Sequence, residues 1–181
     1  MYFINQGIKI SFISALCCLP MSVNAATSGV ETSGDLGLLA LPLLAYGSTF
    51  YFDDGQGRPE FYKSILSTAL ATQLLKVTVR KKRPIEDSYT SFPSGHAAIA
   101  FQSATFIEQR YGWTYGIPAY AVATYVGWTR VESKQHYTID VLAGAAIGVL
   151  TSLYFTTPYN GMHINPYANN GNYGIELSAT F

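Results

Sequence analysis

The sequence predicts an all-α fold, a helical bundle of five helices that becomes six if the N-terminal segment is retained. Apolar segments of helical length recur at regular intervals along the 181 residues, which suffice for one domain with one core. Between these segments lie Pro, Gly and Asp in turn-forming combinations. Charged residues make up only 12% of the chain, about half the usual share of a soluble domain, so we expect a membrane-embedded bundle.

The first 25 residues have the pattern of a targeting segment. Lys9 precedes an apolar stretch, and residues 23–25, Val-Asn-Ala, provide the small residues that a signal peptidase needs. We expect cleavage, and the alternative is an uncleaved first transmembrane helix. Because Cys17 and Cys18 both lie here, a cleaved chain would have no thiol for disulfides, zinc sites or nucleophilic catalysis.

The main predicted domain, residues 26–157, holds the five helical segments. Each segment has either the 3.6-residue period of an amphipathic helix or the length of a buried one, although a strand is a weaker alternative for 119–128. The last two segments approach the roughly 20 apolar residues that cross a bilayer. The predicted segments are 37–52, 61–79, 96–109, 113–129 and 139–156.

Residues 158–181 form a polar C-terminal extension with a different pattern. They are rich in Asn, Gly, Tyr and Pro, and from Tyr173 onward apolar residues alternate with small or polar ones. An alternation of period two is typical of a strand. We therefore predict a lone strand or an ordered extension here, and we assign it no chemistry.

The stretch Pro93-Ser94-Gly95-His96 stands before the third helical segment and offers a cradle for an oxyanion. Ser94 can cap the helix, and the N–H groups at a helix N-terminus bind anions well. Gly95 lets an anion approach the backbone closely, and His96 can give a proton near neutral pH. Taken alone, the stretch is more simply a helix cap, so its interpretation depends on partners elsewhere.

Two cations upstream are the first such partners. Lys76 and Arg83 are seven positions apart, two helical turns, and therefore lie on one face. Pro84 biases Arg83 toward the helix end, and a lysine with an arginine suits a phosphoryl group. The basic residues 80–82 between them are interpreted as a solvated helix end or a membrane flank. We do not expect nucleic acid as a partner, because the net charge is zero and no aromatic residues interleave with the cluster.

The third group of residues is Arg130, His136 and Asp140. His136 and Asp140 are four positions apart, so within a helix the carboxylate can reach the imidazole. An acid bound to one ring nitrogen fixes the tautomer and leaves the other nitrogen free to attack or to accept a proton. Arg130 would bring one more cation to the same place. An isolated pair of this kind is more simply a histidine satisfied in the core.

Together the three groups run Lys-x6-Arg-Pro, Pro-Ser-Gly-His and Arg-x5-His-x3-Asp over residues 76–140. This pattern resembles the type 2 phosphatidic acid phosphatase (PAP2) superfamily, which includes lipid phosphatases, class A acid phosphatases and vanadium haloperoxidases. The flanking helices fit that family's bundle. One position departs from the pattern: a serine usually precedes the arginine of the third group, and here it is Thr129, which keeps the hydroxyl.

The resemblance implies phosphoryl transfer through a phosphohistidine, without a metal or another cofactor. His136 would be the nucleophile, held by Asp140, and His96 would protonate the leaving oxygen and then activate water. The remaining groups would neutralise the phosphoryl oxygens. These groups are Lys76, Arg83, Ser94, Gly95 and Arg130.

We expect the substrate to be a phosphorylated lipid and the protein to lie in the inner membrane with its site facing the periplasm. Alternating helices bring all three groups to one side, which is periplasmic if segment 37–52 enters from outside. The alternatives are a soluble periplasmic acid phosphatase acting on small phosphoesters and a vanadium-dependent haloperoxidase, against which the short chain argues. A non-enzymatic helical envelope protein, whose motif is a relic or a phosphate sensor, is the third alternative.

Overall fold

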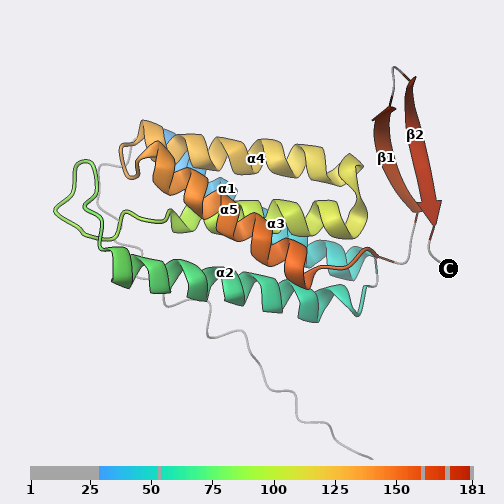
Figure 1. Cartoon of the computed structure of the whole chain (residues 1–181), viewed down its shortest axis with the longest axis horizontal. Coiled ribbons are helices and arrows are strands. Elements are labelled where there is room, and N and C mark those ends of the chain that lie inside the picture. Colours follow the sequence, from blue (N-terminus) through green and yellow to red (C-terminus); the bar gives the residue numbers. More distant parts are fainter. Residues whose placement is uncertain (1–28, 53, 160–161, 170–171, 180–181) are drawn as a thin grey trace, which may run out of the picture.

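The computed structural model describes residues 29–52, 54–159, 162–169 and 172–179. The predicted all-α bundle is confirmed in this part of the chain, with five helices (Figure 1). They are α1 (Gly29–Tyr51), α2 (Gly57–Val79), α3 (Gly95–Tyr111), α4 (Trp113–Glu132) and α5 (Thr138–Phe155). The predicted targeting segment, residues 1–25, lies outside the described residues.

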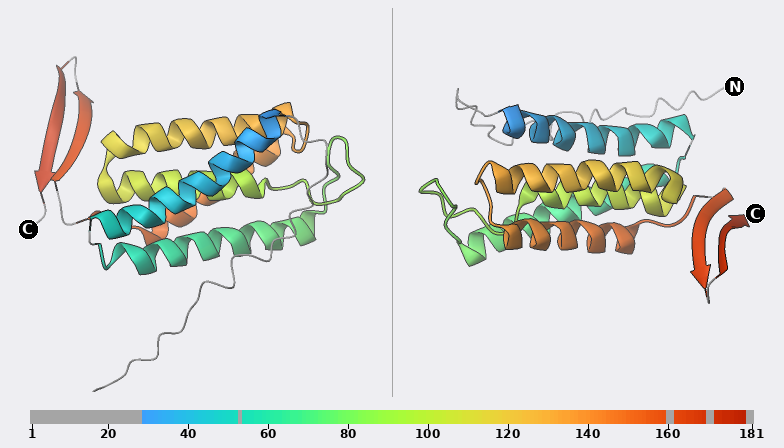
Figure 2. Two further views of the ribbon diagram at one scale, coloured as in Figure 1. Left: turned by 180° about the vertical axis from the view of Figure 1, so that it is seen from behind. Right: turned by 90° about the horizontal axis from the view of Figure 1, so that it is seen from above.

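Helix α3 is the centre of the bundle. It contacts each of the other four helices, and Figure 2 shows α1 and α5 on opposite sides of it. Two glycines of α5 make the closest of these approaches possible. A Cβ at Gly144 would collide with the carbonyl of Ser94, and one at Gly148 with the carbonyl of Ala98. The start of α3, with the Ser-Gly-His stretch, is therefore held directly against α5.

Neighbouring helices alternate in direction, so the end of α2, the start of α3, the end of α4 and the start of α5 meet at one end of the bundle (Figure 1). The N-terminal end of α1 reaches the same end (Figure 2). The loop 80–94 between α2 and α3 also lies there. This arrangement brings all three predicted groups of residues to one place, as the sequence led us to expect.

The opposite end of the bundle holds a buried ion-pair network that the sequence analysis did not single out. The Arg110 side chain is 2% exposed and donates two hydrogen bonds of 2.6 Å to the Asp54 carboxylate. It also contacts Glu60 at 3.3 Å and the Thr157 carbonyl at 2.6 Å. The carbonyl of Arg110 accepts from Tyr159 N at 3.0 Å, so the network holds the segment that leaves α5.

The C-terminal extension forms a two-stranded antiparallel hairpin, β1 (Met162–Asn169) and β2 (Asn172–Ala179). The alternating pattern from Tyr173 onward corresponds to β2, which the structure pairs with a second strand rather than leaving it alone. In β1 the alternation of apolar and polar residues covers only the first four positions and stops at Pro166, and the sequence did not lead us to expect this strand.

Candidate active site

His136 occupies the loop between α4 and α5 and is 4% exposed. Its Nδ1 lies 2.7 Å from the carbonyl oxygen of Ser91. A carbonyl can only accept, so Nδ1 carries the proton and Nε2 keeps its lone pair. Burial, followed by the charges of Lys76 and Arg83, lowers the pKa of His136 to about 3. The imidazole is therefore neutral at pH 7 and can act as a nucleophile.

Asp140 supports His136 through Ser91, whereas the sequence analysis expected direct contact. The Asp140 carboxylate accepts from Ser91 Oγ at 2.5 Å, from Lys81 Nζ at 2.7 Å and from the Tyr137 backbone N–H at 3.1 Å. The expectation assumed that both residues lie in one helix, but α5 begins only at Thr138. Asp140 instead completes the N-terminus of α5, and the carbonyl of Ser91 accepts the hydrogen bond that Nδ1–H of His136 donates.

Lys81 was interpreted as part of a solvated basic helix end, and the structure corrects this. Its ammonium pairs with the fully buried Asp140 carboxylate and lies 4.4 Å from the centre of the Tyr137 ring. Helix α2 ends at Val79, and Arg80 adopts a left-handed backbone with φ of 47°. The chain therefore turns back toward the site directly after α2, which carries Lys81 to Asp140.

The start of α3 forms the helix cap that the sequence predicts. Ser94 is buried, and its hydroxyl caps the helix by accepting from Ala97 N at 3.4 Å. A Cβ at Gly95 would lie 4.0 Å from Cε of Lys76, so the lysine stem passes beside this helix N-terminus. An anion at the N-terminus of α3 would thus meet both the helix N–H groups and the lysine.

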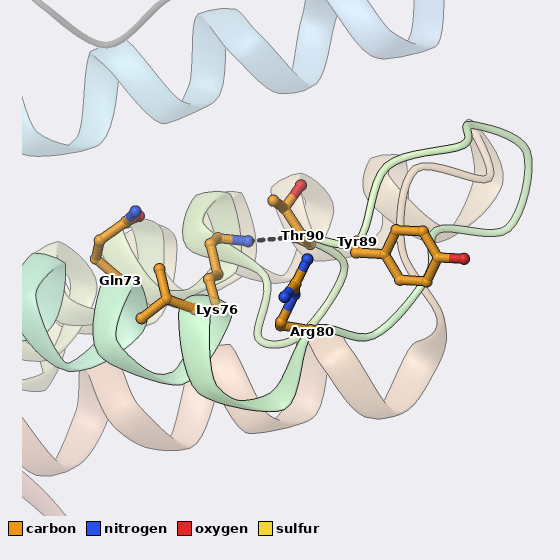
Figure 3. A pocket seen from close by; sticks show the side chains of 6 residues that line it. Gln73, Lys76, Arg80, Tyr89 and Thr90 are labelled. Carbon is orange, nitrogen blue, oxygen red and sulfur yellow. Dashed lines mark hydrogen bonds between the residues drawn. The ribbon is translucent and has the colours of Figure 1, made fainter.

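Lys76 lies beside the N-terminus of α3 and also lines a pocket. Its Nζ donates to the carbonyls of Thr90 at 2.7 Å and Pro93 at 2.8 Å. Figure 3 shows Lys76 reaching toward Thr90, with Arg80 beside it and Tyr89 at the rim. The pocket has a volume of about 340 Å³. Its lining residues are Gln73, Lys76, Val77, Arg80, Tyr89 and Thr90.

Arg83 retains an unused donor at the site. Its Nη1 donates to Gln135 Oε1 at 2.6 Å and to Glu86 Oε2 at 3.1 Å. Its Nε is buried and has no hydrogen-bond partner within the part of the chain that the structure describes. A buried guanidinium donor without a partner is costly for a folded protein unless a ligand satisfies it. This donor is therefore well suited to a phosphoryl oxygen.

Arg130 and His96 meet at a residue that the sequence analysis missed, Asp35 of α1. The Asp35 Oδ1 atom lies 2.9 Å from Nη1 of Arg130 and 3.1 Å from Nε2 of His96. Thr129, which stands where the family pattern has serine, uses its hydroxyl to accept from Arg130 Nε at 3.3 Å. Asp35 is the last acidic residue before the uncharged stretch 37–52, and this position was the available signal in the sequence.

The arrangement is suited to nucleophilic transfer of a tetrahedral oxyanion. It combines a buried neutral histidine, a second histidine and cations on three elements with a helix N-terminus. Among the described residues, no group of three or more His, Cys, Asp or Glu side chains is placed to hold a metal ion.

The chain is similar to a known protein family and to curated proteins. Residues 55–161 match the family model of the PAP2 superfamily. The chain is 34% identical over 121 residues to the lipid A 1-phosphatase of Porphyromonas gingivalis, covering 61% of this chain and 27% of that protein. It is 38% identical over 78 residues to the lipid A 4'-phosphatase of Helicobacter pylori, covering 43% and 39%. The chain thus spans less than half the length of these relatives.

Two solved structures share the fold. The crystal structure of Aquifex aeolicus LpxE superposes with a TM-score of 0.59 at 24% identity, over 72% of this chain and 87% of that one. A transmembrane PAP2-type phosphatidylglycerolphosphate phosphatase from Bacillus subtilis gives a TM-score of 0.57 at 26% identity, over 70% and 72%. Both likenesses extend across most of the bundle described above.

Proposed function

This chain belongs to the PAP2 superfamily, and on that basis we propose that it is a phosphatase that releases phosphate from a phosphorylated lipid. The observation that carries the proposal is the state of His136. Its imidazole is buried, neutral and oriented by the Ser91 carbonyl. After burial, the charges of Lys76 and Arg83 contribute most to its lowered pKa. The proposed phosphatase unit is the bundle, residues 26–157, and residues 158–181 are an extension of it.

In the proposed reaction, Nε2 of His136 attacks the phosphorus atom and the bond to the leaving oxygen breaks. His96 gives that oxygen its proton, which yields the alcohol and a phosphohistidine. His96 then takes a proton from a water molecule that attacks the phosphohistidine, and phosphate leaves. Throughout, Lys76, Arg83 and the N-terminus of α3 stabilise the negative charge on the phosphoryl oxygens.

A lipid substrate is supported by the surface next to the pocket as well as by the relatives named as lipid A phosphatases. Val77 lines the pocket, and it continues a row of exposed apolar side chains along α2. Leu66, Leu70 and Leu74 belong to this row and are 56–65% exposed. An amphiphile can therefore place its polar head beside Lys76 and its apolar chains along α2.

We propose that the bundle lies in the inner membrane with the site facing the periplasm. One described helix, Thr138–Phe155, is long and apolar enough to cross a bilayer, which alone is weak evidence. Stronger support comes from exposed leucines on other helices, such as Leu43 and Leu66, while Thr68 and Gln102 are fully buried. Polar groups inside and apolar groups outside suit a lipid environment. If a carbonate wash released most of the protein from membranes, the soluble periplasmic alternative would hold instead.

The direct test of function is a phosphate-release screen of purified protein in detergent. The panel contains lipid A phosphates, phosphatidate, phosphatidylglycerophosphate, a polyprenyl diphosphate and soluble p-nitrophenyl phosphate. We expect lipid phosphates to be hydrolysed most efficiently, vanadate to inhibit and a chelator to have no effect. Release from soluble esters alone would favour the acid phosphatase. Bromide oxidation by peroxide with added vanadate, without phosphatase activity, would favour the haloperoxidase, which the phosphatase relatives do not support.

A further inference from the structure

Asp35 contacts two of the predicted site residues from a helix that lies outside the matched family region. The family match begins at residue 55, whereas α1 spans Gly29–Tyr51. A single carboxylate oxygen, Oδ1 of Asp35, lies within hydrogen-bond distance of both His96 Nε2 and Arg130 Nη1. The Asp35 side chain is 31% exposed, so these contacts are made at the edge of the site.

The packing of α1 fixes the place of this carboxylate. A Cβ at Gly34 would collide with Thr129 Oγ1 and the Arg130 guanidinium, so α1 and α4 approach closely at this point. One turn earlier, the carbonyl of Glu31 accepts from Arg130 Nη2 at 2.8 Å. Arg130 thus forms hydrogen bonds with α1 at two successive turns. The close packing of α1 against α4 places Asp35 beside His96.

We propose that Asp35 is a positioning residue of the active site, which holds His96 in the orientation needed to protonate the leaving oxygen and ties it to Arg130. This inference rests on the proposed phosphatase function. An ionised carboxylate can only accept, so Nε2 of His96 keeps its proton and Nδ1 is the atom that exchanges a proton with substrate and water. When Nδ1 gives its proton to the leaving oxygen, the neutral ring stays bound to Asp35 until Nδ1 takes a proton from water.

The surroundings of His96 are consistent with this role. Its ring shares the Asp35 carboxylate with Arg130 of α4, and it lies close enough to His136 of the α4–α5 loop for the two rings to interact electrostatically. Within the part of the chain that the structure describes, Asp35 is the carboxylate that pairs with His96. A different role would be a built-in blocker, since Asp35 occupies a position between Arg130 and His96 that a phosphoryl oxygen could take. The two roles predict opposite effects of removing the charge.

The test compares Asp35→Asn with the wild type on two substrates that differ in their need for a general acid. A lipid phosphate releases an alcohol that must be protonated, whereas p-nitrophenyl phosphate releases a phenolate that leaves without a proton. The quantity measured is kcat/KM, which reports the steps up to departure of the leaving group. Asp87→Asn is the matched control, because the Asp87 side chain is 93% exposed and pairs with Lys82 on the surface.

We expect Asp35→Asn to lower kcat/KM about 10- to 100-fold for the lipid phosphate and less than about threefold for p-nitrophenyl phosphate. Asp87→Asn should change neither, and Asp35→Glu should recover part of the loss because it keeps the charge. Equal losses on both substrates would overturn the proposal in favour of a structural role. A lower KM with unchanged kcat would overturn it in favour of the blocker.

A spectroscopic readout covers the case in which Asp35→Asn folds poorly. In wild-type protein with ¹⁵N-labelled histidine, we expect His96 to carry its proton on Nε2, and Asp35→Glu to retain this signature. A wild-type His96 ring that is protonated on Nδ1 alone would contradict the positioning role. If the wild-type protein hydrolysed neither substrate although His96 carried its proton on Nε2, the proposed phosphatase function would be wrong. The contact between Asp35 and His96 would still be supported.

Discussion

The two ends of the bundle each hold a buried cluster of charged side chains, but only one cluster has its hydrogen bonds complete. At the far end, the Arg110 guanidinium is shared among Asp54, Glu60 and the carbonyls of Thr157 and Pro158. At the site end, Arg83 Nε is buried without a partner among the described residues. The first cluster is closed, and the second has capacity for a ligand.

The two ends also differ in the ratio of cationic to carboxylate side chains. In the far-end cluster, one arginine faces two carboxylates, Asp54 and Glu60. At the site end, cations outnumber the carboxylates that contact them. The cations are Lys76, Lys81, Arg83 and Arg130, and the carboxylates are Asp35, Glu86 and Asp140. Buried charge by itself therefore does not distinguish the two ends, whereas the balance between cations and carboxylates does.

Replacing the nucleophile should produce the largest effect at the site end. We expect His136→Ala to lower kcat by at least about 10³-fold, because no other described group is placed to attack phosphorus from the same position. It should also abolish acid-labile labelling of the protein by radioactive phosphate. His96→Ala should still trap a labelled phosphoenzyme from p-nitrophenyl phosphate. Activity near the wild-type level in His136→Ala would rule out the phosphohistidine mechanism.

Breaking the far-end cluster should affect stability and leave the chemistry intact. Arg110→Met removes the counter-charge of Asp54 and Glu60 in a buried setting, which we expect to lower the free energy of unfolding by about 3–5 kcal/mol. The kcat/KM of the protein that remains folded should be unchanged. Thermal unfolding in detergent, together with activity per folded molecule, measures both effects. A selective loss of activity at unchanged stability would mean that the two ends are coupled.

Arg83→Met should lower activity and leave stability nearly unchanged, the reverse of what we expect for Arg110→Met. Losing a donor to the phosphoryl group is expected to lower kcat/KM about 10²- to 10³-fold, with little change in the melting temperature. Lys82→Met is the matched control, because Lys82 is exposed and, among the residues that the structure describes, forms its ion pair with the exposed Asp87. A drop in stability for Arg83→Met as large as that for Arg110→Met would show that the site-end cluster is also structural.

The sequence predicted the helices and the convergence of the three motif groups because both depend on local patterns. Apolar segments punctuated by Pro and Gly define the helices, and their alternating directions bring the motif groups together. The start of α1 was not predicted. Residues 29–36 have the composition of a loop, and they are helical in a structure where Gly34 and Glu31 contact Arg130 of α4. Such a tertiary contact leaves no periodic signal in the chain.

The contacts within the site were the least predictable part. The spacing of His136 and Asp140 suggested a direct pair, but the helix boundary at Thr138 separates them and Ser91 mediates between them. Lys81 looked like one member of a basic run, and its partner Asp140 lies 59 positions away. Both features depend on the path of the loop 80–94, and loops of this length carry little sequence signal for their path.

The protonation state of His136 provides the finest test of the site-end cluster. Its pKa falls from 6.5 to about 3 on burial, so between these values the unfolded chain binds the proton more tightly than the folded protein. The contribution of His136 to stability is therefore complete above pH 6.5 and declines as the pH falls toward 3.

In ¹⁵N-histidine spectra recorded at pH 5, we expect the His136 ring to remain neutral. Lys76→Met should raise its pKa only part of the way to 6.5, because burial is the larger cause and persists. A wild-type His136 that titrated near 6.5 would mean that the ring is hydrated, and the neutral nucleophile would then lose its physical basis.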